Sequence, residues 1–250
     1  MSGRCGDRRA RRRFVAGVLV AIVVLSGCGD DSEPAATVES PVDSDPVPAD
    51  HGLAQEQLDA VIASTVGIDG VACGRLANGS GFALTDDLVV TNAHVIVGIE
   101  DIRVNTVDGR TLTGIPVSFD ADADLAILEV QGAELTPLPL GEGSADSIGV
   151  LVGWETDTPD PTPYRIVRPV TVRIESVGST QRIERRSWQL AAEIDLGDSG
   201  AAMVDDDGEV VGVAFATSTA TDQVGYAVRA SVLEDTVAKG MDPNLTIPDC

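Results

Sequence analysis

Hydrophobic residues in most of the chain come in short runs, and Gly, Asp, Pro and Thr separate one run from the next. Short runs rich in β-branched residues between turn-forming residues are typical of β-strands. Many such strands predict an all-β sandwich or barrel instead of a parallel α/β sheet. The expected strands are Gly81 to Leu84, Leu88 to Thr91, Asp101 to Val104, Leu125 to Val130, Ile148 to Val152, Ile166 to Val177 and Val210 to Phe215.

Two segments have the spacing of amphipathic helices instead. The first runs from Leu53 to Ala63 and the second from Ser231 to Lys239. They predict a short helix at each end of the β-rich body. The sequence contains no internal repeat, no metal-spaced His/Cys cluster and no phosphate-binding glycine loop, so we expect neither a metal nor a cofactor.

The N-terminus has the charged, apolar and small-residue order of a secretory signal. Its apolar run, Phe14 to Leu25, is shorter than the roughly 20 residues that span a bilayer. The run closes with a segment that resembles the bacterial lipobox, in which a cysteine, here Cys28, is lipidated and becomes the new N-terminus. We therefore predict a lipoprotein signal peptide over residues 1–27. The alternative is an uncleaved anchor helix, and export by the general or the twin-arginine route stays open.

Residues 28–50 are rich in Asp, Glu, Ser, Pro and Ala and have no hydrophobic period, so they predict a flexible acidic linker. Residues 51–250 are enough for one folded domain with a real core. Together with the signal, this organisation places the domain in the cell envelope, anchored to the outer face of the cell membrane through lipid on Cys28.

The charge of the chain excludes nucleic acid as a partner. The formal net charge is -23, from 17 basic and 40 acidic residues. Without the six arginines and Asp7 at the N-terminus, 11 basic and 39 acidic residues remain, a balance of -28. Such a body repels phosphates, which proteins bind with Lys and Arg. With Lys239 as its only lysine the composition also fits a salt-adapted protein, or simply a solvated acidic surface.

Three blocks carry residues that fit nucleophilic catalysis. An apolar strand ends at His94, and the only other histidine, His51, adjoins the linker. Asp124 directly precedes an apolar strand, and Ser199 lies in a glycine-rich turn. Serine is a weak nucleophile, so a histidine must take its proton and an aspartate must hold the imidazole in the useful tautomer. The order of base, acid and nucleophile also differs from that of α/β-hydrolases.

In this order the blocks resemble trypsin-like serine proteases of the bacterial HtrA type, over about Gly67 to Cys250. The resemblance implies a chymotrypsin-like fold of two antiparallel six-stranded β-barrels with short N- and C-terminal helices. It also implies a serine endopeptidase that acts on proteins or peptides through an acyl-enzyme intermediate. The implied catalytic triad is His94, Asp124 and Ser199.

Further residue roles follow from the same resemblance. The amides of Gly197 and Ser199 are the implied oxyanion-hole donors. Asp124 is preferred to Asp120 and Asp122 because the family's aspartate directly precedes the apolar strand. The residues implied to line the specificity pocket are Glu193, Ile194, Phe215, Ala216 and Thr217. Glu193 in the pocket would favour a basic substrate residue, whereas as a surface residue it would leave specificity open.

The sequence also departs from the HtrA pattern. Asp198 stands where Asn is usual, and Ala201 and Ala202 replace Gly-Pro. In digestive trypsins this aspartate pairs with an N-terminal amine released by cleavage, which a lipidated Cys28 would not provide, so either an arginine pairs with Asp198 or the oxyanion loop is partly unformed. A weakly active or inactive scaffold that binds peptides at the cell envelope is the alternative function. With no PDZ domain expected before the end at Cys250, we predict a monomer.

A closer resemblance is to actinobacterial periplasmic serine proteases linked to acid resistance, which share a cysteine at the position of Cys73, a Gly-Tyr-Ala block and a C-terminal cysteine. Cys5 would be lost with the signal and Cys28 taken by lipid. The remaining Cys73 and Cys250 are then predicted to form a disulfide in an oxidising compartment. Two buried free thiols are the alternative.

Overall fold

The computed structural model describes residues 45–155 and 157–249, which all belong to one compact unit. The expected signal peptide, Cys28, most of the acidic linker and Cys250 lie outside the described residues. Strands dominate, and every pairing between them is antiparallel, which confirms the all-β class. The expected strands all overlap observed ones, with ends that differ by a few residues, although β9 begins well before the predicted Ile166.

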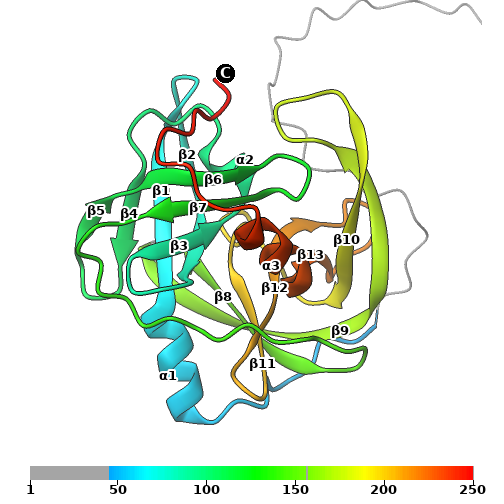
Figure 1. The fold of residues 1–250 in the computed structure, drawn as a ribbon. Helices are drawn as coiled ribbons and strands as arrows, with labels where there is room; N and C mark the ends of the chain where they lie inside the picture. The colour runs from blue at the N-terminus through cyan, green and yellow to red at the C-terminus, as the bar shows by residue number, and fades with distance from the viewer. Residues whose placement is uncertain (1–44, 156, 250) are drawn as a thin grey trace, which may run out of the picture. The chain divides into compact units, whose positions relative to one another are not determined.

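The first half is a seven-stranded sheet of order β5-β4-β1-β2-β3-β7-β6 (Figure 1). Its strands are β1 (Thr65–Ala72), β2 (Arg75–Ala83), β3 (Leu88–Thr91), β4 (Arg103–Thr106), β5 (Thr111–Thr113), β6 (Ile115–Asp120) and β7 (Leu125–Glu129). A six-stranded barrel was predicted for this half, whereas the structure has a sheet of seven strands. The count differs because a tight turn at Gly109, whose φ is 84°, folds the short β5 back onto β4 as a hairpin.

The second half is a closed six-stranded barrel of order β10-β13-β12-β11-β8-β9, as the resemblance implied. Its strands are β8 (Ile148–Glu155), β9 (Thr158–Glu175), β10 (Arg182–Ala191), β11 (Ala202–Asp205), β12 (Val210–Thr217) and β13 (Val224–Arg229). One apolar core spans both halves, since Phe82 and Leu125 of the sheet belong to the same buried cluster as Val213 and Tyr226 of the barrel. This shared core fixes the halves against each other.

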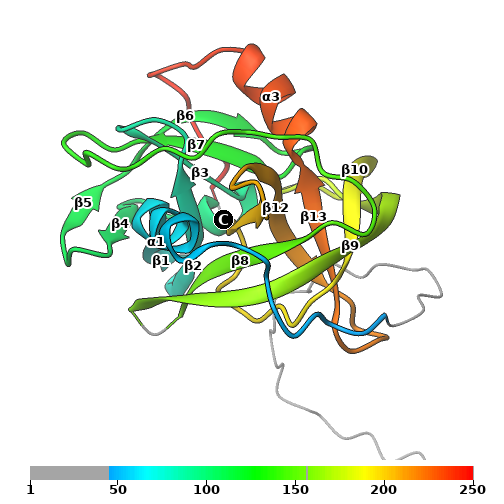
Figure 2. The ribbon, with the colours of Figure 1, turned by 90° about the horizontal axis from the view of Figure 1, so that it is seen from below.

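Three helices complete the described part of the chain: α1 (Gln55–Ser64), α2 (Ala93–Ile96) and α3 (Ala230–Ala238). The first and last correspond to the two predicted helices, and they lie well apart on the β-structure (Figures 1 and 2). The single turn of α2 follows β3 and carries His94. Apart from the undescribed ends and residue 156, the chain forms no helix that is long and apolar enough to cross a membrane.

Candidate active site

The structure brings His94 and Asp124 into direct contact. The His94 Nδ1 atom lies 3.0 Å from Oδ1 and 2.9 Å from Oδ2 of Asp124, and the His94 backbone N–H donates to Oδ1 at 3.0 Å. An ionised carboxylate only accepts hydrogen bonds, so Nδ1 carries the proton in this pair. The neutral imidazole then presents Nε2 as a proton acceptor.

Local backbone geometry aims the Asp124 carboxylate at the imidazole. Asp124 ends the turn between β6 and β7 with a φ of 58°, a left-handed conformation that Asp tolerates better than most residues. The Asn92 side-chain amide, one residue before α2, donates to the Asp124 carbonyl at 2.8 Å. Asn92 thereby ties the turn of Asp124 to the helix that carries His94.

Asp124 stays ionised although it is almost fully buried, with 3% of its surface exposed. Burial by itself would raise the pKa of its carboxyl group, because it removes water from the charged form. Contacts with His94 and then with Arg185 outweigh burial and hold the pKa of Asp124 below its ordinary value. Arg185 donates from Nη1 to Asp124 Oδ2 at 3.3 Å.

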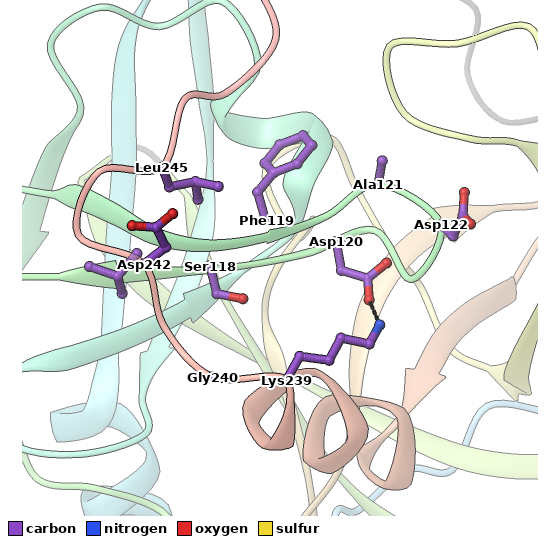
Figure 3. Close-up of a pocket in the computed structure, with 10 residues that line it drawn as sticks. Ser118, Phe119, Asp120, Ala121, Asp122, Lys239, Gly240, Asp242 and Leu245 are labelled. Carbon is purple, nitrogen blue, oxygen red and sulfur yellow. Dashed lines mark hydrogen bonds and ion pairs between the residues drawn. The ribbon is translucent and has the colours of Figure 1, made fainter.

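The two competing aspartates have partners of their own. Asp120 pairs with Lys239 at the end of α3, and the two side chains point toward each other and line a cavity of about 410 Å³ (Figure 3). Asp122 lies further along the turn and accepts a hydrogen bond from the Ser176 hydroxyl at 2.6 Å. Only Asp124 of the three has a bond to His94 among the described residues.

The loop that carries Ser199 is anchored to the first half of the molecule. The Ser199 carbonyl accepts a hydrogen bond from the Ser80 backbone N–H of β2 at 2.8 Å. The following amide, that of Gly200, donates to the Ala214 carbonyl of β12 at 2.9 Å. The loop is thus held between the sheet and the barrel.

Two glycines allow this close approach. A Cβ atom on Gly79 would lie 2.8 Å from the Val95 side chain and 3.1 Å from the Ser199 carbonyl oxygen, so α2 and the Ser199 loop both pack against Gly79. A Cβ atom on Gly200, whose φ is 91°, would lie 2.1 Å from the Ser80 carbonyl oxygen. The residues next to His94 and Ser199 therefore meet at one point of β2.

The Ser80 side chain adds a bridge that the sequence did not reveal. Its buried hydroxyl accepts from the Trp154 backbone N–H at 2.8 Å and donates to the Gly197 carbonyl at 2.6 Å. Gly197 has a φ of 118°, which favours glycine. Among the described residues, neither the Gly197 nor the Ser199 amide has a hydrogen-bond acceptor.

Asp198 has no cationic partner among the described residues, so an arginine does not pair with it there. Its Oδ2 accepts from the Asp195 backbone N–H at 2.9 Å, and only 5% of its surface is exposed. Burial, with smaller contributions from the carboxylates of Glu155, Asp195 and Asp160, raises the pKa of Asp198 to about 6. This carboxyl group is therefore half protonated in mildly acidic solution.

The residues expected around the specificity pocket separate into two groups. The Ile194 side chain packs against Gly225, where its Cδ1 lies 2.2 Å from the position of a Cβ atom, and β13 pairs Gly225 with Thr217 and Tyr226 with Ala216. Phe215 is buried. Glu193 instead is exposed and accepts from the Gln223 side chain at 2.9 Å.

A polar cavity of about 390 Å³ is lined mainly by residues of β1, β2 and β4. Asn78, Gly79 and Trp154 form the part of its wall nearest to Gly197, and Arg103 and Asp69 form a salt bridge in it. Among the described residues no group of His, Cys, Asp and Glu side chains has the arrangement of a metal site.

Cys73, at the tight turn between β1 and β2, is in a disulfide. The other three cysteines lie outside the described residues, so the predicted pairing with Cys250 stays a prediction.

Comparisons with known proteins agree with this geometry. A family model described as a trypsin-like peptidase domain matches residues 79–213. Serine protease Rv3671c of Mycobacterium tuberculosis is 30% identical over 175 residues, which are 67% of this chain and 43% of that protein. A probable periplasmic serine endoprotease DegP-like of Halomonas elongata is 32% identical over 144 residues, 56% of this chain and 29% of that protein. This chain thus spans less than half the length of either relative.

The crystal structure of the Rv3671c protease from M. tuberculosis in its active form is similar over 86% of this chain and 97% of that one. The TM-score is 0.71 and the sequence identity 26%. The inactive form of the same protease matches with a TM-score of 0.69 at 25% identity, over 79% of this chain and 98% of that one.

Proposed function

This chain belongs to the trypsin-like peptidases, within the serine proteases related to HtrA, and on that premise we propose that it cleaves peptide bonds as an exported, lipid-anchored serine endopeptidase. The proposed catalytic residues are His94, Asp124 and Ser199. The proposed substrate is a protein or a peptide, and no metal or cofactor takes part.

In the proposed reaction the Ser199 hydroxyl attacks the carbonyl carbon of the scissile bond while His94 Nε2 accepts its proton. Asp124, bonded to Nδ1, holds this tautomer and stabilises the imidazolium that forms. The amides of Gly197 and Ser199 bind the developing oxyanion, and a lost donor of this kind typically costs about 2.7 to 4 kcal/mol. His94 then gives the proton to the leaving amine, and water releases the acyl group from Ser199.

The observation that carries the proposal is the contact of a buried, ionised Asp124 with both the ring and the backbone of His94. The test is labelling by a fluorophosphonate probe, which reacts with activated serines. We expect the wild-type protein to be labelled. Ser199→Ala should not be labelled, and its turnover should fall by a factor of about 10⁶. Ser144→Ala removes an exposed serine and is the matched control. Equal labelling of all three proteins would refute the proposal.

A second candidate function is a weakly active or inactive scaffold that binds peptides. The observation that favours it is Asp198, a buried carboxylate next to Ser199 with no cation among the described residues to hold it. If the scaffold reading holds, a peptide will bind to both the wild-type protein and Ser199→Ala, and neither will cleave it.

Lipidation of Cys28 is the proposed membrane anchor, which makes the lipid membrane a partner of the mature monomer. We expect Cys28→Ala to move the protein from the membrane fraction into the soluble exported fraction. Unchanged membrane retention would favour the uncleaved anchor helix.

We also propose that Cys250 is the partner of Cys73. The bridge would restrain the C-terminal tail, and closing so long a loop stabilises by up to roughly 5 kcal/mol in the chain-entropy description. Mass spectrometry of the mature protein under non-reducing conditions should find the two cysteines in one cross-linked peptide pair. Two alkylatable thiols after unfolding without reductant would rule the bridge out.

A further inference from the structure

Arg185 is a charged residue inside the second half of the molecule, directly behind the proposed triad. It lies in β10, and only 1% of its side chain is exposed. The next residue, Arg186, points the opposite way and pairs on the surface with Asp235 at 2.6 Å. Charged side chains are almost never fully buried unless they are paired. The burial of Arg185 therefore needs a compensating interaction.

The Arg185 guanidinium joins the two halves at the carboxylate of Asp124. Its Nε donates to the Asp122 carbonyl at 2.9 Å and its Nη1 to Asp124 Oδ2 at 3.3 Å. Its central carbon lies 4.9 Å from the centre of the Phe215 ring of β12, within the range of a cation–π contact. Its Nη2 has no hydrogen-bond acceptor among the described residues.

The charges around Arg185 come from one turn and one helix end. The carboxylates of Asp124, Asp120 and Asp122 face it from the β6–β7 turn, and Lys239 at the end of α3 pairs with Asp120. Burial lowers the pKa of Arg185, and these three carboxylates oppose that effect. The guanidinium remains charged at any pH at which an enzyme works.

The Oδ2 atom of Asp124 therefore has two partners of different kinds. His94 Nδ1 approaches it at 2.9 Å and Arg185 at 3.3 Å. When His94 takes a proton, two cations share one carboxylate. This sharing makes protonation of His94 less favourable than it would be beside Asp124 alone.

We propose that Arg185 is a positioning residue that holds Asp124 in place from the opposite half and keeps His94 in its neutral, proton-accepting form to lower pH. This inference rests on the proposed function for its effect on catalysis, but its effect on the titration of His94 does not depend on turnover. Nδ1 of His94 and Nη1 of Arg185 lie 2.9 Å and 3.3 Å from the same Asp124 oxygen. A like charge that close in a protein interior is worth at least one pKa unit, so removing the guanidinium should raise the pH at which His94 titrates by about one unit.

The test follows the imidazole of His94 by NMR as the pH changes, in a Ser199→Ala background. The chain has only two histidines, so His51→Gln assigns the signals. We expect Arg185→Met to move the His94 midpoint up by about one pH unit, whereas Arg185→Lys, which keeps the charge, should stay close to the wild-type midpoint. Arg186→Met removes the neighbouring exposed arginine and should leave the midpoint unchanged.

In the active protein the acid limb of kcat/KM should move by the same amount in Arg185→Met, and kcat/KM at the optimum should fall by at least tenfold. A His94 midpoint that stays put in folded Arg185→Met overturns the inference. If that variant does not fold, Arg185→Gln replaces it, because glutamine keeps a donor for the Asp122 carbonyl without the charge, and the same shift is required. Failure of the proposed function is a different result: every variant would lack activity while the His94 midpoints still moved.

Discussion

The surroundings of Asp124 and Asp198 differ in one respect that decides the charge of each carboxyl group. Both residues are almost fully buried, with 3% and 5% of their surfaces exposed, and each lies beside a proposed catalytic residue. Asp124 is met by His94 and Arg185, and its pKa falls below the ordinary value. Asp198 is met by a backbone amide and three carboxylates, and its pKa rises to about 6.

The difference teaches that burial does not decide ionisation by itself. Burial is the largest influence at both sites and raises the pKa at both. The outcome depends on whether a cation lies within reach to compensate for the lost water. The carboxyl group beside His94 is thus permanently charged, whereas the carboxyl group beside Ser199 changes its charge in mildly acidic solution.

The largest effect is expected when each carboxylate is replaced by its amide. Asp124→Asn should lower kcat by about 10⁴, because the amide favours the wrong tautomer of His94. Asp198→Asn should cost far less, since no ionic bond of Asp198 is lost. Steady-state kinetics on a peptide substrate would measure both, with Asp122→Asn as the control within the same turn. Losses of equal size for Asp124→Asn and Asp198→Asn would contradict the comparison.

A smaller effect concerns stability and pH. The pKa of Asp198 is about 6 in the folded protein against an ordinary 3.8, so between these values the folded state binds more protons than the unfolded state. Stability therefore falls as the pH rises from about 4 to about 6, by about 3 kcal/mol in total. Asp198→Asn removes this loss. The difference in free energy of unfolding between Asp198→Asn and the wild-type protein should therefore shift in favour of the variant, by up to about 3 kcal/mol, between pH 4 and pH 7.5.

Urea unfolding at the two pH values would measure the change. Asp206→Asn replaces an exposed carboxylate and should show no such growth. If Asp198→Asn gained nothing at pH 7.5, its carboxylate would have to be compensated by a group that the described structure does not contain.

The smallest effect comes from a single acidic neighbour. Glu155 raises the pKa of Asp198 through charge repulsion, after the larger influence of burial. Glu155→Gln should therefore lower the Asp198 midpoint, measured by carboxyl NMR, by a few tenths of a pH unit, as screened repulsion in a partly hydrated loop allows. Glu142→Gln is the control on the surface. A rise of the Asp198 midpoint in Glu155→Gln would contradict the repulsion between the two carboxylates.

Much of the fold could be predicted because strand signals are local. Runs such as Leu88 to Thr91 and Val210 to Phe215 became β3 and β12 with little change. β1 was missed because it contains Gly67 and Gly70, which normally weaken a strand. Residues from other parts of the chain require glycine at these two positions. A Cβ atom on Gly67 would lie 2.4 Å from the Trp154 ring, and one on Gly70 would lie 2.3 Å from Ile99.

In the candidate site, too, the locally encoded features could be predicted and the long-range contacts could not. His94, Asp124 and Ser199 stand in recognisable local blocks, and the structure gives the choice among the three aspartates a geometric basis that the sequence lacked. The contacts of Arg185 and Ser80 with the site could not be predicted from the sequence. The partners of Arg185 lie 61 and 63 residues away, and those of the Ser80 hydroxyl lie 74 and 117 residues away. A strand with several charged residues also looks like a solvated surface.

The placement of the site across two halves has a consequence for biogenesis. The proposed base, His94, and its aspartate belong to the half built on the seven-stranded sheet, and the proposed nucleophile, Ser199, belongs to the half built on the closed barrel. A chain in which only one half has folded holds no complete triad. If the proposed triad is correct, a newly made molecule could not cleave its unfolded neighbours until the two halves had packed together.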